Sequence, residues 1–385
     1  MNIKELDKQY VANTYRRFDL QIVSGKGALC CDENGKEYID MTSGIGVNSF
    51  GYCDDVWQKA IEEQARTLSH TSNLYYTEPC AKLAHMLCEK TGMKKVFFSN
   101  SGAEANECAV KVARKYAAEH KGAEYYNIIT LNKSFHGRTL TTLAATGQEN
   151  FHQLFTPLTE GFLYVDAEDI EGLKKLVAEN KIAGVMLEVV QGEGGVNALS
   201  EGYLKAVQKL CNENDLVLII DEVQTGIGRT GYFYSYMRYG LHPDVVSSAK
   251  GLAGGLPMGA TLMSEKVESV LGFGDHGSTF GGNPVCAAAA LSVISRIDSN
   301  FLSQVEKKGA YIKEELEKTG AEVSGLGMML GIKTDKPVSE IISECMEKGV
   351  LCLSAKEKLR LLPPLNIEWD TLKKAVEIIK NVIAA

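Results

Sequence analysis

Hydrophobic and polar positions fall into alternating blocks from about residue 80 onward. Short apolar runs, typical of buried strands, are separated by longer stretches whose apolar residues recur every three or four positions, as on one face of a helix. The runs lie at 94–102, 129–134, 182–195, 216–221 and 244–250, and the helical stretches lie at 80–92, 103–122, 168–181 and 202–215. Near-continuous Val, Ile and Leu runs between helices predict an α/β fold with a mostly parallel central sheet covered by helices.

The pattern changes character after Asn283. We expect helices at 285–297 and 304–320, one glycine-punctuated strand at 323–334 and a final helix at 369–385. These segments predict a smaller α+β domain. We therefore divide the chain into an N-terminal segment (1–50), a large domain (51–282) and a small C-terminal domain (283–385).

Composition narrows the function classes. The chain has 385 residues, 45% of them hydrophobic, and a formal net charge of -8 at pH 7. Phosphate binding along a nucleic acid needs a surplus of Lys and Arg, so we expect no nucleic-acid partner. No apolar run is long enough for a membrane span, and the N-terminus carries acids and lacks the apolar part of a secretory signal. The ten cysteines show no zinc spacing, so we expect reduced thiols, no metal site and a cytoplasmic protein.

Lys250 lies between an apolar run and a glycine-rich stretch, in PDVVSSAKGLAGGLPMGA. No acidic residue between Asp244 and Glu265 can pair with it. A buried amine without a partner has a lowered pKa. A neutral amine is a nucleophile that condenses with carbonyl compounds. The alternative, from this stretch alone, is a lysine that extends from a strand end into water.

Ligands bind beyond the carboxyl ends of the strands in such sheets, so the residues that follow each run are the site candidates. Ser101, Gly102 and Ala103 form the first group, at a strand-to-helix turn. Free N–H groups and the helix dipole at such a turn attract a phosphate. Taken alone, the turn is better explained by Ser101 as a plain helix N-cap.

Phe135, His136 and Arg138 form the second group. An aromatic ring at a strand end can stack on a flat heterocycle, and an arginine can bind a carboxylate through two hydrogen bonds. His136 is a candidate general base. In isolation, core packing is the simpler explanation for Phe135, and a structural role is the simpler one for His136.

Two acidic residues complete the set. Glu193 lies in a glycine-rich loop, and Asp221 follows the strongest apolar run directly. A carboxylate at that position needs a cationic or N–H partner, and a protonated pyridine nitrogen meets this need. Lys250 supplies the amine that an aldehyde cofactor requires. Together with the phosphate turn, these groups indicate a pyridoxal phosphate site.

Seven motifs occur in order along the chain: NSGAEANE, FHGRT, EVVQGEGG, IIDEVQTGIGRTG, AKGLAGGLPMGA, HGSTFGGNP and RLLPPL. Together they resemble those of the class III (ω-amino acid) aminotransferases, specifically the acetylornithine aminotransferase group, from about residue 22 to the end. The resemblance implies pyridoxal 5'-phosphate as cofactor and the fold type I architecture of pyridoxal phosphate-dependent transferases. It also implies a homodimer with active sites at the subunit interface.

The resemblance also implies a role for each matching residue. Lys250 would bind the cofactor aldehyde covalently, and Asp221 would pair with the pyridinium nitrogen. The other implied cofactor-binding residues are Ser101, Gly102 and Ala103 at the phosphate, Phe135 and Val223 on the two ring faces, Gln224 near the ring hydroxyl, His136, and Thr279 reaching the neighbouring subunit's cofactor. The implied substrate-binding residues are Arg138, Glu193, Ser278 and Arg360.

Two arginines and a glutamate suggest how one pocket accepts two substrates. By resemblance, Arg138 binds the α-carboxylate of acetylornithine, and Arg360 binds a carboxylate of glutamate. Glu193 would neutralise Arg360 and move away when glutamate binds. The alternative is that Arg360 and Glu193 are separate surface charges.

The resemblance implies transfer of the δ-amino group of N2-acetylornithine to 2-oxoglutarate, which yields N-acetylglutamate 5-semialdehyde and glutamate, a step of arginine biosynthesis. His136 in FHGRT favours the acetylated donor over ornithine. Succinylornithine, succinyl-diaminopimelate, ornithine and 4-aminobutyrate remain alternative donors, and a racemase or decarboxylase on the same fold is a more remote alternative. Asp19 stands where a proline is common, and FGYCDDV lacks the usual Gly-His and His-Pro pairs, so donor choice is the open point.

Overall fold

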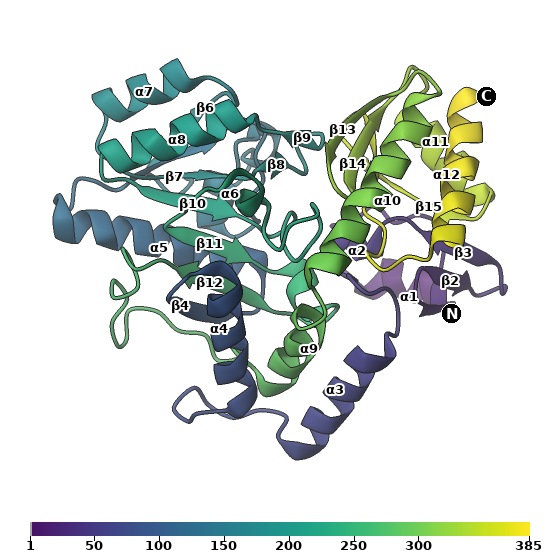
Figure 1. The fold of residues 1–385 in the computed structure, drawn as a ribbon, viewed down its shortest axis with the longest axis horizontal. Coiled ribbons are helices and arrows are strands. Elements are labelled where there is room, and N and C mark those ends of the chain that lie inside the picture. Colours follow the sequence, from purple (N-terminus) through teal and green to yellow (C-terminus); the bar gives the residue numbers. More distant parts are fainter. Residues whose placement is uncertain (1) are drawn as a thin grey trace.

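A seven-stranded sheet forms the centre of the computed structural model, which describes residues 2–385 (Figure 1). Its order is β4-β12-β11-β10-β7-β5-β6. Strand β12 runs antiparallel to β11 and β4, and the other neighbouring pairs are parallel. The strands are β4 (Lys95–Ser99), β5 (Asn127–Leu131), β6 (Phe162–Val165), β7 (Ile182–Leu187), β10 (Val217–Asp221), β11 (Val245–Ser248) and β12 (Gly259–Met263).

Helices cover both faces of this sheet, which is why its central strands are apolar throughout. Along β10, Val217 and Ile219 pack against the long helix α5, whereas Leu218 and Ile220 pack into the core on the other face. The helices of the large body are α3 (Asp55–Thr67), α4 (Glu78–Thr91), α5 (Gly102–His120), α6 (Leu140–Ala145), α7 (Ile170–Glu179), α8 (Glu201–Glu213) and α9 (Pro284–Ile294). The predicted α/β class with a mostly parallel sheet is confirmed.

The second body combines both ends of the chain. One sheet has the order β13-β14-β17-β16, and another has the order β1-β2-β3-β15, in which β3 and β15 pair in parallel. In Figure 1 the purple N-terminal strands lie beside the yellow C-terminal helix. The strands are β1 (Ile22–Lys26), β2 (Leu29–Asp32), β3 (Glu37–Asp40), β13 (Glu322–Leu326), β14 (Met329–Lys333), β15 (Val350–Leu351), β16 (Leu353–Ala355) and β17 (Lys358–Leu361). The helices are α10 (Ser299–Glu317), α11 (Val338–Glu347) and α12 (Trp369–Ala384).

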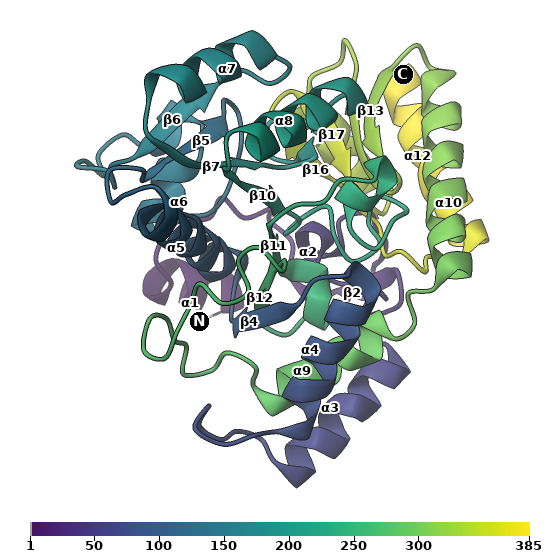
Figure 2. The same ribbon diagram turned by 60° about the vertical axis from the view of Figure 1, so that its left-hand side comes forward.

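The predicted division of the chain at residues 50 and 282 stays a prediction. The packing groups the elements somewhat differently, because Ile39 and Met41 belong to the core of the second body. Helix α9 packs with α3 and α4 at the lower end of the molecule (Figures 1 and 2). Its residues Ala287 and Val293 belong to the core of the large body.

One sequence expectation was wrong. Residues 323–334 form a hairpin of β13 and β14 rather than a single strand. The chain turns at Gly327, whose φ of +53° suits glycine, and a side chain there would collide with the backbone of Thr230. The period-2 pattern of two short strands joined by so tight a turn reads like one interrupted strand.

No single helix within residues 2–385 is long and apolar enough to cross a membrane, and α9 with α10 reaches that length only across a 74° bend. All ten cysteines are free thiols. No group of His, Cys, Asp and Glu among the described residues is arranged to hold a metal ion. The cytoplasmic location stays a prediction.

Candidate active site

A cavity of about 530 Å³ opens where the parallel strands of the large sheet end. That volume lies in the range of sites for small molecules and cofactors. Most of the predicted site residues line it: Ser101, Gly102, Ala103, Phe135, His136, Arg138, Asp221, Val223, Gln224 and Lys250. They come from the ends of β4, β5, β10 and β11, so the strand topology brings together residues that are far apart in the sequence.

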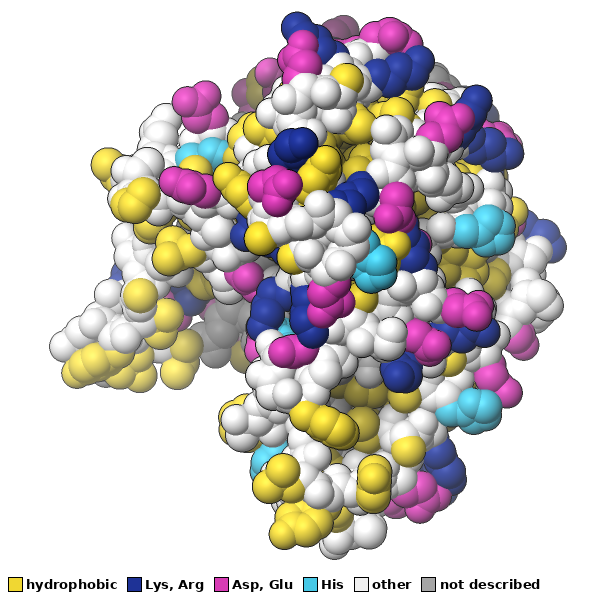
Figure 3. Space-filling view, turned by 90° about the vertical axis from the view of Figure 1, so that its left-hand side faces the viewer, with side chains coloured by type: hydrophobic (Ala, Val, Ile, Leu, Met, Phe, Trp, Pro, Cys, Tyr) yellow, Lys and Arg dark blue, Asp and Glu magenta, His cyan; other side chains and the backbone are white. Residues whose placement is uncertain are grey.

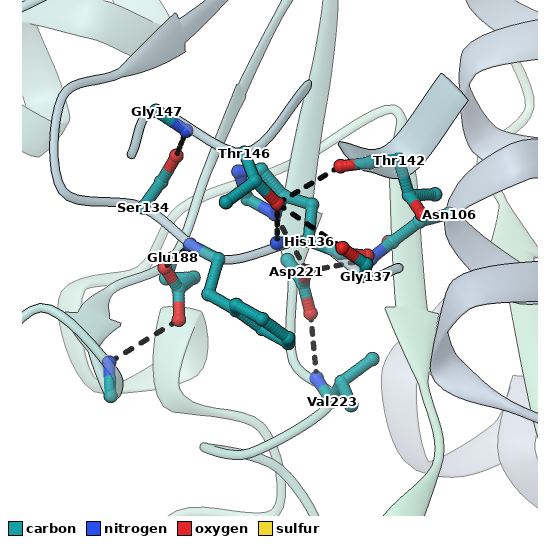
Figure 4. A network of polar contacts seen from close by, with 12 residues as sticks. Asn106, Ser134, His136, Gly137, Thr142, Thr146, Gly147, Glu188, Asp221 and Val223 are labelled. Atoms are coloured by element: carbon teal, nitrogen blue, oxygen red, sulfur yellow. Dashed lines mark hydrogen bonds and ion pairs between the residues drawn. The ribbon is translucent and has the colours of Figure 1, made fainter. Parts of the chain in front are cut away.

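Asp221 is the most firmly held side chain in the cavity (Figure 4). It is 3% exposed. Its Oδ2 accepts hydrogen bonds from Asn106 Nδ2 (2.7 Å) and His136 Nδ1 (2.8 Å), and its Oδ1 accepts one from Val223 N (2.9 Å). A carboxylate has about four acceptor positions, so one further donor can be accommodated. Within residues 2–385, His136 Nε2 is buried without a partner, so the ring is held at Nδ1 by Asp221.

Lys250 follows β11 and begins the short helix η3 (Lys250–Ala253). Its φ of +46° is unusual for a residue with a side chain, and such strain persists where the surroundings over-determine the backbone. Burial lowers the pKa of the Lys250 amine, and the nearby carboxylates of Asp221, Glu193 and Glu188 oppose that shift. Lys250 is half-buried and lines the cavity, so the alternative of a lysine that extends from the strand end onto the outer surface does not describe it.

Ser101 acts as the N-cap of α5, as its simpler interpretation suggested. Its Oγ accepts from Glu104 N and donates to Glu104 Oε2 (3.2 and 2.9 Å). The N–H groups of Gly102 and Ala103 make no hydrogen bond to residues 2–385. A Cβ at Gly102 would lie 2.7 Å from Val223 Cγ1, so glycine is needed for the helix to approach the Asp221 loop. The turn thus presents unpaired donors and a helix N-terminus to the cavity.

Glu188 lines the cavity and was missed in the sequence. Its carboxylate accepts hydrogen bonds from Phe135 N (3.0 Å) and Gly192 N (3.3 Å), and it joins the loops that carry Phe135 and Glu193. Burial raises the pKa of Glu188 to about 7. The signal was present, because Glu188 directly follows β7 in the same way that Asp221 ends β10.

Glu193 and Arg360 meet as an ion pair, although neither lines the cavity directly. Arg360 Nη1 lies 2.5 Å from Glu193 Oε1 and 3.3 Å from Gln224 Oε1. Burial opposes ionisation of Glu193, but Arg360 outweighs it and leaves the pKa of Glu193 below its ordinary value. The alternative of two separate surface charges does not describe this contact, since Arg360 is only 4% exposed.

Arg138 is exposed at the mouth of the cavity. Its guanidinium lies 5.5 Å from the ring centroid of Phe135 and 4.0 Å from that of Phe151. Stacking on two aromatic rings restricts the side chain while its N–H donors stay available. Arg138 can therefore bind an anion that enters the cavity.

Ser278 and Thr279 do not line the cavity of their own chain. Ser278 Oγ accepts a hydrogen bond from Asn100 Nδ2 (3.0 Å), and Asn100 does line it. Thr279 is exposed. The structure thus places Ser278 behind the cavity wall and Thr279 on the surface.

Other lining residues gave little signal in the sequence. Asn106 donates to Asp221 and to His136 O from the first turns of α5, where a polar residue usually faces solvent. Val47 comes from the N-terminal segment, and residues 255–258 follow the glycine stretch after Lys250. Only the tertiary fold brings these segments to the cavity.

Comparison with known proteins agrees with this geometry. The family model for class III aminotransferases matches residues 10–383. The acetylornithine aminotransferase of Haemophilus ducreyi is 51% identical over 99% of this chain and 98% of its own length. Among solved structures, the N-acetylornithine aminotransferase from Stenotrophomonas maltophilia is 33% identical (TM-score 0.85, 99% of this chain and 98% of that chain). The ornithine aminotransferase from Toxoplasma gondii is 31% identical (TM-score 0.95, 99% and 94%). Matched by its family model along nearly its whole length, the chain belongs to the class III aminotransferases.

Proposed function

We propose that the protein is a pyridoxal 5'-phosphate-dependent aminotransferase that transfers the δ-amino group of N2-acetylornithine to 2-oxoglutarate. The products are N-acetylglutamate 5-semialdehyde and glutamate, a step of arginine biosynthesis. The observation that carries the proposal is the convergence of Asp221 and Lys250 on one cavity of cofactor size. The 51% identical Haemophilus ducreyi enzyme supports the choice of donor.

The residues present fit the cofactor at each of its polar ends. Asp221 retains an acceptor position for a protonated ring nitrogen. The unpaired N–H groups of Gly102 and Ala103, with Ser101, suit a phosphate. When bound, the cofactor withdraws electrons from the amine-bearing carbon of the substrate. Phe135 and Val223 would flank its ring, Gln224 would lie near its hydroxyl, and His136 would hold Asp221 in place.

Lys250 carries the proton transfers in this proposal. Lys250 would hold the cofactor aldehyde through its amine, which is a nucleophile in its neutral form. It then removes the proton from the amine-bearing carbon of the donor as a general base. Burial lowers the pKa of Lys250 and so favours its unprotonated form.

Substrate carboxylates are assigned to two arginines. Arg138 would bind the α-carboxylate of acetylornithine at the mouth of the cavity, and Ser278 would lie near substrate. Arg360 would bind a carboxylate of glutamate once Glu193 releases it. Because the Glu193–Arg360 pair is closed in the structure, a donor with one carboxylate meets a neutral wall there.

We propose a homodimer on the basis of one exposed apolar surface. The loops at 68–77 and 273–281 are joined by hydrogen bonds from Asn73 Nδ2 to Ser278 O and Gly281 O (3.0 and 2.9 Å). Both loops expose large apolar side chains: Leu74, Tyr75, Tyr76, Phe273 and Phe280. Figure 3 shows hydrophobic side chains at the lower end of the face that it draws. A patch of this kind marks an interaction site, and Thr279 beside it would reach the partner's cofactor.

The test is glutamate formation by the purified holoenzyme with 2-oxoglutarate and one of four donors: acetylornithine, ornithine, succinylornithine or 4-aminobutyrate. We expect the highest kcat/KM with acetylornithine. The match to an ornithine aminotransferase structure makes ornithine the second candidate, so a higher kcat/KM with ornithine would change the assignment. Donor turnover without any keto acid would indicate a racemase or decarboxylase instead.

A further inference from the structure

Arg229, in the GIGRTG motif, is a buried cation outside the cavity. It is 2% exposed and is among the largest fully buried side chains. It follows Asp221 and Gln224 on the same loop but does not line the cavity. A buried guanidinium is costly unless its N–H groups are hydrogen-bonded, so its partners indicate what it holds together.

The partners of Arg229 lie in the second body. Its Nη1 donates to Pro363 O (2.5 Å) and Met328 O (3.3 Å), and Met328 N donates to Arg229 O (3.0 Å). Met328 immediately precedes β14, and Pro363 lies two residues beyond β17. These strands are antiparallel, and Gly331 is paired with Arg360. One guanidinium therefore holds the start of β14 and the end of β17, the two inner strands of the sheet, close to Arg360.

The turn after β3, in the N-terminal segment, also holds the residues that follow β17. Leu362 N donates to Met41 O (2.8 Å), and Ser43 Oγ donates to Leu362 O (2.6 Å). Asp40 Oδ2 and Arg229 Nη2 are both buried and have no hydrogen-bond partner in the described part of the chain, and the two groups attract each other. The residues that follow Arg360 are thus fixed between the Arg229 loop and the turn after β3.

We infer that Arg229 is a positioning residue for Arg360 and so a determinant of how the enzyme binds substrates with two carboxylates. The inference rests on the proposed role of Arg360 as a carboxylate-binding residue. The loop from Asp221 to Arg229 carries Gln224, which accepts from Arg360 Nη1, and Arg229, which holds the strand of Arg360. One loop thereby sets the distance from Arg360 to the cavity.

The consequence differs between the two substrates. Glutamate and 2-oxoglutarate carry two carboxylates, so their binding depends on the distance of the Arg360 guanidinium from the cavity. Acetylornithine carries one, which Arg138 binds, and Arg138 lies on the loop after β5 with no contact to Arg229. Loss of the hydrogen bonds from Arg229 should therefore weaken glutamate binding and leave the half-reaction with acetylornithine nearly unchanged.

The first test is Arg229→Lys in the holoenzyme, since the lysine nitrogen lies one atom closer to the backbone than Arg229 Nη1, which reaches both carbonyls. We expect the KM for glutamate in a single-turnover half-reaction to rise about tenfold, with acetylornithine turnover changed by less than about threefold. Glutarate, a dicarboxylate without an amine, gives a readout independent of turnover. Its Kd, followed by the visible spectrum of the cofactor, should rise by the same factor. Arg238→Lys, in the exposed ion pair with Glu306, is the matched control and should change neither value.

Equal losses in both half-reactions, or no change in the KM for glutamate, would overturn the positioning role. If Arg229→Lys does not fold, Ser43→Ala decides by the same criteria, because it removes one hydrogen bond to Leu362 from the opposite side. Arg360→Ala separates the proposed role of Arg360 from that of Arg229. If it leaves glutamate binding unchanged, the proposed role of Arg360 fails. If it weakens glutamate binding and Arg229→Lys does not, only the role of Arg229 fails.

Discussion

Two sets of residues at the cavity are held in place in different ways. We call Asp221 and Lys250 the first wall, and Glu193 and Arg360 the second wall. Asp221 and Lys250 come from adjacent strands of one sheet, and the Asp221 carboxylate is held by three hydrogen bonds. The second wall lies behind Gln224, which lines the cavity and contacts Arg360: Glu193 lies on a glycine-rich loop and Arg360 on a strand of the second body. These two are held mainly by their contact with each other and by Gln224.

The difference separates chemistry from substrate choice. Groups on sheet strands keep their geometry through a reaction, as proton transfer requires. A single ion pair across two bodies can open when a substrate carboxylate replaces Glu193 as the partner of Arg360, because the buried arginine then does not stay unpaired. We therefore expect substitutions at the first wall to abolish turnover and substitutions at the second wall to redistribute it between substrates.

The largest effect is expected for Lys250→Ala. Both half-reactions should slow by at least about 10³-fold, because the variant lacks the amine that moves the proton. The cofactor should still be retained, since Asp221 and the N-terminus of α5 remain. Single-turnover absorbance measures each half-reaction, and Lys175→Ala on the exposed face of α7 is the control. Turnover close to that of the wild type would refute the role of Lys250.

A smaller loss is expected for Asp221→Asn, which keeps the shape of the side chain and removes its charge. The ring nitrogen then loses its anionic partner, and kcat/KM should fall about 10²-fold for both substrates alike. Steady-state kinetics with each substrate measures this. A loss confined to one substrate would contradict the assignment of Asp221 to the first wall.

The convergence of the residues at the first wall could be predicted from the sequence because it follows from one rule. Asp221, Lys250, Phe135 and His136 each follow an apolar run, and parallel strands bring their carboxyl ends to one edge. Glu188 obeys the same rule, but the glycine-rich loop that follows it makes Glu193 the more prominent acidic residue of this segment in the sequence. The assignment of helices and strands succeeded for the same reason, as periodicity is strong in buried elements.

The other parts of the fold and site depend on tertiary contacts that leave no pattern in the local sequence. Val47 reaches the cavity from the N-terminal segment, and Ile39 packs in the core of the second body, so the two ends of the chain share one unit. Arg229 looks like a polar residue in a turn, and its burial appears only when Met328 and Pro363 fold over it. Contacts between distant segments are not encoded in periodicity.

At the second wall, Glu193→Ala should alter the ratio of the kcat/KM values for the two substrates. Without its carboxylate partner, Arg360 is free to bind glutamate at all times. We expect kcat/KM for glutamate relative to acetylornithine to rise about tenfold, which corresponds to about 1.4 kcal/mol. Competition between the two substrates measures the ratio, and Glu179→Ala on α7 is the exposed control. An unchanged ratio would remove the gate from the mechanism.

The smallest effect concerns Glu188, which lies between the walls, and it appears as a pH dependence of stability. The folded protein holds the proton of Glu188 up to a pKa of about 7, because burial disfavours the carboxylate, whereas the unfolded chain releases it near the ordinary glutamate pKa of 4.5. The stabilisation by this proton is complete below the lower value and is lost as pH rises through the higher one. Relative to Glu188→Gln, the apoprotein should therefore lose about 1 to 3 kcal/mol of unfolding free energy across this window.

Urea unfolding of the wild type and of Glu188→Gln at a series of pH values measures this difference. The glutamine keeps one acceptor oxygen for Phe135 N or Gly192 N, so it adds an offset of about 1 kcal/mol that does not vary with pH. His136 and Asp221 act on Glu188 in both directions, since the first lowers its pKa and the second raises it. The difference between the two proteins should fall only between the two pKa values. A difference that stays flat from acid to neutral pH would show that Glu188 ionises normally and that the region between the walls is open to water.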